Sequence, residues 1–136
     1  MRLLDADILS YAIYDESPFY DAAWQYVKRG VLGEVEMVVT PVTVLEAYNV
    51  LYWYYRVRPR RLLLRKLSLL VESLTLVPTS IRGLDVALNE NIPLGDGFLI
   101  ATALESKLPV IVSNDSHILK VARKYGLIVE NPLKNL

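Results

Sequence analysis

The sequence contains no cysteine and only one histidine, His117, among its 136 residues. The absence of cysteine excludes disulfide bonds and thiolate metal ligands, and a single histidine excludes a zinc site built from several histidines of one chain. Long apolar runs are missing as well. No unbroken stretch of about 18 apolar residues occurs, so the sequence predicts no membrane span. Because no signal-peptide core precedes the first acidic residues, we expect a cytoplasmic protein.

The chain also lacks an excess of charge of either sign, with 15 Lys and Arg residues against 15 Asp and Glu residues. This balance speaks against a polyanionic partner, but the distribution of charge does not. The stretch "RVRPRRLLLRK", from Arg56 to Lys66, contains six basic residues and no acidic one. It can be the solvated face of a helix whose leucines pack inward, or a surface that binds phosphates.

What the sequence does contain is an alternation of short apolar runs with longer amphipathic ones, and 53% of its residues are hydrophobic. This pattern predicts βα units around a parallel sheet, and the length predicts a single domain over residues 1–136. The expected strands are residues 2–5, 36–40, 75–78, 108–114 and 127–130, with one or two helices in most of the intervals.

Four acidic residues lie where this topology brings the ends of strands together. Asp5 and Asp115 each follow an apolar strand, Glu46 lies two turns into the helix after the second strand, and Asp96 opens the helix before the fourth. Right-handed crossovers place the C-terminal ends of parallel strands along one edge of the sheet, where open α/β sheets carry their sites. We therefore expect the four carboxylates to converge at this edge.

Asp7, Asp96 and Asp115 also have a purely structural interpretation. Each is placed either to cap a helix or to interact with the helix dipole in its first turn. Asp5 lies closer to its strand, and we expect Asp7 instead of Asp5 to cap the first helix. His117 is interpreted as a surface or packing residue and receives no catalytic role.

The helix that carries Glu46 is apolar on most of its faces, and we expect it to be buried on most sides. Thr43, Glu46 and Asn49 form a polar strip at three-residue spacing, which can either face solvent or line a polar pocket. The aromatic run Tyr52–Tyr55 is interpreted as core or as a dimer interface in preference to a base-stacking platform.

Taken in order, these acidic stretches resemble the motifs of PIN-domain nucleases, in particular the small single-domain VapC toxins. "LLDADILSY" places Asp5 at the first acidic position, and "TPVTVLEAYNVL" places Glu46 at the second. "LGDGFLIATALESKLPVIVSND" places Asp96 and Asp115 at the third and fourth. The resemblance covers essentially the whole chain. It departs at Asp7, where the family commonly has Asn, Ser or Thr, so that Asp7 either adds a ligand or raises the pKa of a neighbour.

The resemblance implies a PIN-like three-layer α/β/α sandwich, with a central parallel sheet of about five strands. It also implies a metal-dependent endoribonuclease, the toxin of a type II toxin–antitoxin pair, that leaves 5′-phosphate and 3′-hydroxyl ends. Oxygen ligands without cysteine or histidine clusters favour Mg²⁺ or Mn²⁺. Asp5, Asp96 and Asp115 are then the principal metal ligands, and Glu46 binds a second ion or orients the attacking water.

The expected partners are RNA, a cognate antitoxin and a second copy of the chain in a homodimer, with no membrane. Arg58, Arg60 and Arg61 are the candidates for contacts with the RNA backbone. Two alternatives stay open. One is a catalytically silent PIN-like module for RNA binding or assembly. The other is a haloacid-dehalogenase-type phosphatase, which "DAD" and "GDG" suggest, although the other motifs of that family are missing.

Overall fold

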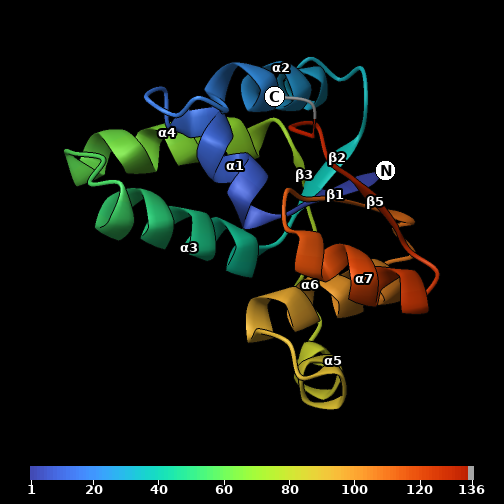
Figure 1. Ribbon diagram of the computed structural model, residues 1–136. Helices are drawn as coiled ribbons and strands as arrows, with labels where there is room; N and C mark the ends of the chain where they lie inside the picture. Colours follow the sequence, from blue (N-terminus) through green and yellow to red (C-terminus); the bar gives the residue numbers. More distant parts are fainter. Residues whose placement is uncertain (135–136) are drawn as a thin grey trace.

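The computed structural model describes residues 1–134, and it consists of a parallel sheet with helices on both faces (Figure 1). Within the described residues, no helix has the length and hydropathy needed to cross a membrane. The elements follow in the order β1 (Arg2–Leu4), α1 (Ala6–Ile13), α2 (Tyr20–Val31), β2 (Met37–Val39), α3 (Pro41–Asn49), the π-helix η1 (Val50–Tyr54), α4 (Arg60–Glu72), β3 (Thr75–Leu76), α5 (Gly83–Glu90), α6 (Leu94–Glu105), β4 (Val110–Val112), α7 (Ser116–Lys124) and β5 (Ile128–Glu130).

The sheet has five parallel strands in the order β3-β2-β1-β4-β5, which confirms the predicted α/β fold. Its central strands are short and apolar apart from Arg2 at the start of β1, because both of their faces are covered by helices. From β1 the chain moves outward through β2 to β3, and then returns to place β4 on the other side of β1. The order of the strands therefore reverses between β1 and β4, the position at which α/β sheets of this type carry their sites.

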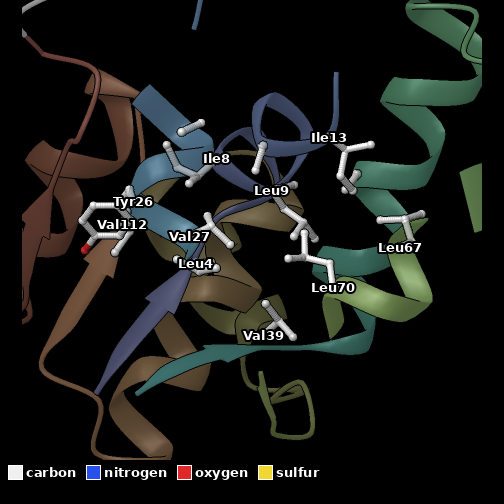
Figure 2. Packing of buried hydrophobic residues seen from close by; sticks show 14 of the residues in the cluster. Leu4, Ile8, Leu9, Ile13, Tyr26, Val27, Val39, Leu67, Leu70 and Val112 are labelled. Atoms are coloured by element: carbon white, nitrogen blue, oxygen red, sulfur yellow. The ribbon is translucent and has the colours of Figure 1, made fainter. Parts of the chain in front are cut away.

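Neighbouring residues of each central strand belong to opposite hydrophobic cores, because successive side chains point to opposite faces of a sheet. Leu4 and Val112 pack with residues of α1, α2, α3 and α4, in the core that Figure 2 shows. Leu3 and Ile111 pack with residues of α5, α6 and α7 on the opposite face. Figure 1 shows these two groups of helices on the two sides of the sheet, which confirms the predicted three-layer arrangement.

The helix that carries Glu46 begins as the sequence predicts and then departs from the expectation. Thr40 caps it by accepting a hydrogen bond from the Thr43 backbone N–H at 3.1 Å, and Pro41 occupies its first position. After Asn49 the backbone widens into the π-helix η1. The expectation that this helix is buried on most sides is wrong, because Leu45, Trp53 and Tyr54 are all exposed.

Candidate active site

Asp5 leaves β1 at the reversal point of the sheet, and its backbone N–H donates to the Val112 carbonyl at the end of β4. Asp5 itself is the N-cap of α1, so the prediction that Asp7 caps this helix is wrong. The strand ends at Leu4 and the helix begins at Ala6, so Asp5 is the single residue between them. One carboxylate oxygen of Asp5 accepts from the Ala6 N–H at 2.7 Å.

The other oxygen of Asp5 accepts from the Ser113 hydroxyl at 2.7 Å, and the same hydroxyl accepts from the Asp115 backbone N–H at 3.0 Å. Ser113 therefore links the first and the fourth acidic positions, which lie on different elements. Its side chain is only 2% exposed. Burial raises the pKa of the Asp5 carboxyl, the Ser113 bond opposes that rise, and the charge of Asp115 adds to it.

Asp7 lies in the first turn of α1 and points to the loop that follows β4. One of its oxygens accepts from the Ile8 N–H at 2.7 Å, and the other accepts from the Asn114 N–H at 3.0 Å. Burial and then the neighbouring charge of Asp5 raise the pKa of Asp7 to about 7. The repulsion between Asp5 and Asp7 therefore raises the pKa of Asp7 itself.

Asp115 is the N-cap of α7 and accepts from the His117 backbone N–H at 2.8 Å, as its structural interpretation predicted. Asp96 lies in the first turn of α6. Burial, and then the charges of Asp5, Asp115 and Glu46 in that order, raise the pKa of Asp96 to about 7 against an opposing effect of His117. The carboxylate of Asp96 is therefore within electrostatic reach of the three other acids.

Glu46 points from α3 toward the first turn of α6. A Cβ atom on Gly95 would overlap the Glu46 carboxylate, so the absence of a side chain at Gly95 allows this approach. Burial and then the charge of Asp5 raise the pKa of Glu46. The polar strip of α3 thus faces the acidic edge of the sheet at Glu46, with Thr43 buried and Asn49 exposed.

Within residues 1–134 none of the four acids forms an ion pair, and the one opposing charge that acts on Asp96 is that of His117. The ion pairs there join Arg2 to Glu130 and Lys124 to Glu90, and neither involves this edge. Clustered carboxylates without a cation are stabilised by a divalent metal, and a set of oxygen donors without cysteine fits Mg²⁺ or Mn²⁺.

In the present positions of the side chains, no three acidic or histidine groups of residues 1–134 are arranged to hold a metal ion. The oxygens of Asp5, Asp7 and Asp115 are directed toward backbone and hydroxyl donors instead. An oxygen that accepts one hydrogen bond keeps a second lone pair for a metal ion, so metal binding by this donor set requires a different arrangement of the carboxylates but not the loss of these bonds.

The arginines considered for RNA binding lie at another place, around the turn that connects η1 to α4. Arg58 lies over the Tyr52 ring, 3.5 Å from its centroid, and donates to the Tyr52 carbonyl. Arg60 donates to the hydroxyl groups of Tyr48 and Tyr52, both at 3.0 Å. Arg61 is exposed in the first turn of α4. In Figure 1 this turn lies at the end of α3 and α4 that points away from the sheet.

Sequence reasoning missed Ser113 and Gly95 as parts of the site. The signal for Ser113 was available, because it is the first polar residue after the apolar strand and directly precedes the Asn114–Asp115 pair. The signal for Gly95 was weaker. A glycine in the first turn of a helix has no evident local purpose, and its neighbour Glu46 is remote in the sequence.

Comparison with known proteins gives a family and a fold. The family model described as PIN domain matches residues 2–124. The structure of PAE2754 from Pyrobaculum aerophilum is similar, with 21% identity, coverage of 94% of this chain and 82% of that chain, and a TM-score of 0.69.

Two solved complexes each contain a chain that is similar to this one over nearly its whole length. The structure of VapBC2 from Rickettsia felis bound to a DNA fragment from their promoter has 16% identity and a TM-score of 0.68, and the match covers 96% of this chain and 97% of that chain. A toxin–antitoxin complex from Klebsiella pneumoniae has 17% identity, coverage of 97% and 98%, and a TM-score of 0.63. No curated protein matches the sequence significantly.

Proposed function

The chain belongs to the PIN domain family, and from this premise we propose that it is a metal-dependent endoribonuclease with a site formed by Asp5, Glu46, Asp96 and Asp115. The observation that supports this proposal most directly is the position of Asp96. The charges of the three other acids raise its pKa, although the four residues come from four different elements. Such a concentration of uncompensated carboxylates is costly to a fold that does not use it.

In this proposal Asp5, Asp96 and Asp115 hold Mg²⁺ or Mn²⁺, and Glu46 orients the attacking water or binds a second ion. A bound divalent cation lowers the pKa of water and stabilises the negative charge that develops on the scissile phosphate. Ser113 is a positioning residue, because its hydroxyl contacts Asp5 and the backbone of Asp115 together.

Asp7 has a supporting role in the proposed site. Its hydrogen bond to the Asn114 N–H connects α1 to the loop that carries Asp115, and so it keeps the first and fourth acids near each other. The proposed products are a 5′-phosphate and a 3′-hydroxyl.

We also propose that the chain is the toxin of a toxin–antitoxin pair and that a cognate antitoxin inhibits it. The support is that two similar structures are described as VapBC2 and as a toxin–antitoxin complex. A mainly apolar cavity of about 300 Å³ between α1, α2 and α4, lined in part by Ile13, Trp24 and Leu69, has a chemistry suited to an apolar segment of such a partner. A homodimer is the second assembly we propose, and the exposed apolar side chains Leu45 and Leu64 of α3 and α4 are available for it.

The test is cleavage of an end-labelled RNA pool in Mg²⁺, in Mn²⁺ and in EDTA. We expect cleavage by the wild type only with metal, and loss of cleavage in the Asp5→Asn and Asp96→Asn variants. Asp85→Asn is a matched control, because Asp85 occupies the same position in the first turn of α5 that Asp96 occupies in α6, but is exposed. It should cleave as the wild type does.

Two other results would replace the proposal. If the folded wild type binds the RNA without cleaving it under any metal condition, the chain is an RNA-binding module. If metal-dependent hydrolysis is found for a small phosphate ester such as p-nitrophenyl phosphate and not for RNA, the phosphatase alternative is correct.

A further inference from the structure

A row of aromatic side chains begins beside the acidic edge and runs along α1. Asp7, Tyr11 and Tyr14 are spaced four and three residues apart, so they share one face of this helix. Burial, the neighbouring Tyr55 and the charge of Asp7 all raise the pKa of Tyr11, so the Tyr11 hydroxyl is within electrostatic reach of both Asp7 and Tyr55. The row therefore starts at a residue of the candidate site.

The row continues across to the end of η1. The Tyr14 ring stacks on Tyr55 with a centroid distance of 4.3 Å and an interplanar angle of 25°. Tyr55 in turn meets the Tyr54 ring edge to face, at 4.9 Å and 88°. We call Tyr11, Tyr14, Tyr55 and Tyr54 the aromatic array.

The outer member of the array is a large ring in solvent. Tyr54 is 77% exposed, and its neighbour Trp53 is 59% exposed. Tyr54 therefore keeps most of its surface in solvent although it contacts the Tyr55 ring. Short π-helical segments are frequently found at functional sites, and contiguous exposed apolar surface marks positions where a ligand or partner binds.

The charge beside the exposed rings is positive and unpaired. Arg56 follows the array directly and is exposed, and Arg58 lies two residues further on. Neither of them, nor Arg60, forms an ion pair within residues 1–134. Asp15 and Glu16 lie near the Tyr14 hydroxyl, so a polyanion that approaches the array is favoured on the side of Arg56.

Aromatic rings interleaved with unpaired arginines are the surface that binds single-stranded nucleic acid, because rings stack on unpaired bases and cations contact phosphates. A second copy that met this face with the same face would also bury Trp53 and Tyr54, but it would bring the three arginines of one copy against those of the other. The charge therefore favours RNA as the occupant.

We propose that the aromatic array binds a single-stranded segment of the RNA substrate, with one unpaired base stacked on the Tyr54 ring and the adjacent phosphate at Arg56. The array leads along α1 to Asp7, so a strand bound in this way is directed to the acidic edge. This inference rests on the proposed ribonuclease function, and it adds the side chains that hold the strand outside the acidic site.

The test measures RNA binding in EDTA, because the proposed cleavage does not proceed without metal. The probes are a fluorescent 12-nucleotide single-stranded RNA pool, the same pool carrying 2-aminopurine at successive positions, and a blunt RNA duplex of equal length. We expect Tyr54→Ala to weaken single-strand binding about 5- to 100-fold, which corresponds to the loss of one base–aromatic stack. We expect Tyr54→Phe to retain the binding and the quenching of aminopurine, because it retains the ring.

Leu88→Ala is the control, since Leu88 is an equally exposed apolar residue on the distant helix α5, 80% exposed. It should bind as the wild type does. Equal binding by Tyr54→Ala and wild type would overturn the inference, and so would equal losses for single strand and duplex. A change of sedimentation with unchanged RNA binding would assign the array to a protein interface instead.

The failure of this inference is distinguishable from the failure of the proposed function. If the wild type cleaves RNA with metal and Tyr54→Ala cleaves and binds equally well, only the array assignment is wrong. If the wild type neither cleaves nor binds RNA, the proposed function and the array assignment are both wrong.

Discussion

Gly95→Ala offers a sharp test of the proposed site, because it perturbs a carboxylate without removing any charge. The glycine lies in the first turn of α6, and a Cβ atom there would overlap the carboxylate of Glu46. The overlapping atoms are the far end of a flexible side chain, so Glu46 can move aside while the backbone stays in place. Relieving the overlap requires a displacement of the carboxylate on the order of 1 Å, and a misplacement of that size at a catalytic group costs up to about 100-fold in rate.

The same change should not harm the fold. Alanine is a better helix former than glycine by about 1 kcal/mol in a helix interior, so the free energy of unfolding should stay the same or rise by less than that amount. We therefore expect kcat/KM for RNA cleavage to fall about 10- to 100-fold while the Tm is unchanged or higher. Gly97→Ala is the contrasting control, because a Cβ there would meet the Gly83 carbonyl and Ala87 on α5. It should lower the stability by about 1–3 kcal/mol.

The assay is steady-state cleavage of a labelled RNA by wild type, Gly95→Ala, Glu46→Ala and the double variant. If Gly95→Ala acts through Glu46, it produces no further loss once Glu46 has been truncated. Losses that multiply in the double variant would refute this reasoning, as would full activity of Gly95→Ala.

Three further predictions follow from the structure. Ser113→Ala removes the hydrogen-bond donor to Asp5, so it should raise the pKa of Asp5 further in an NMR titration. It should also reduce RNA cleavage at pH 7 more than at pH 9. An unchanged pH profile of cleavage would contradict the positioning role of Ser113. Because the pKa values of Asp7 and Asp96 in the folded chain, about 7, lie above their unfolded values, the folded state binds more protons between about pH 4 and 7. The Tm of the metal-free protein should therefore fall as pH rises through this window, and Asp7→Asn should flatten the profile in thermal melts. A stability that rises from pH 5 to 8 in the wild type would contradict the shifts. Leu63→Ala truncates a fully buried side chain of α4 and should cost about 2–5 kcal/mol in urea denaturation, whereas a cost below 1 kcal/mol would contradict its placement in the core.

The order of the elements could be predicted from the sequence because each strand is a short apolar run and each helix has its own periodicity. The central strands "RLL", "MVV" and "VIV" are buried on both faces, which leaves an unambiguous signal. The cap of α1 could not be predicted in the same way. The choice between Asp5 and Asp7 depends on whether β1 ends at Leu4 or one residue later, and no local pattern decides that.

The exposure of the apolar residues on α3 and η1 could not be predicted from the sequence either. Apolar composition predicts burial, yet Trp53 and Tyr54 are exposed, because the helix extends beyond the core and widens into a π-helix at its end. The contact between Ser113 and Asp5 spans 108 positions of the chain. Periodicity describes neighbours along one element, so it has no information about such contacts.

The central claim is that the acids at the junction of β1 and β4 bind a divalent metal, and the most direct measurement is a titration of the metal-free protein with Mn²⁺ at pH 8, followed by electron paramagnetic resonance of the free ion. The account predicts saturable binding by the wild type and by Asp85→Asn, and its loss in a folded Asp96→Asn variant. Equal binding by Asp96→Asn and wild type, or no saturable binding by the wild type, would contradict it.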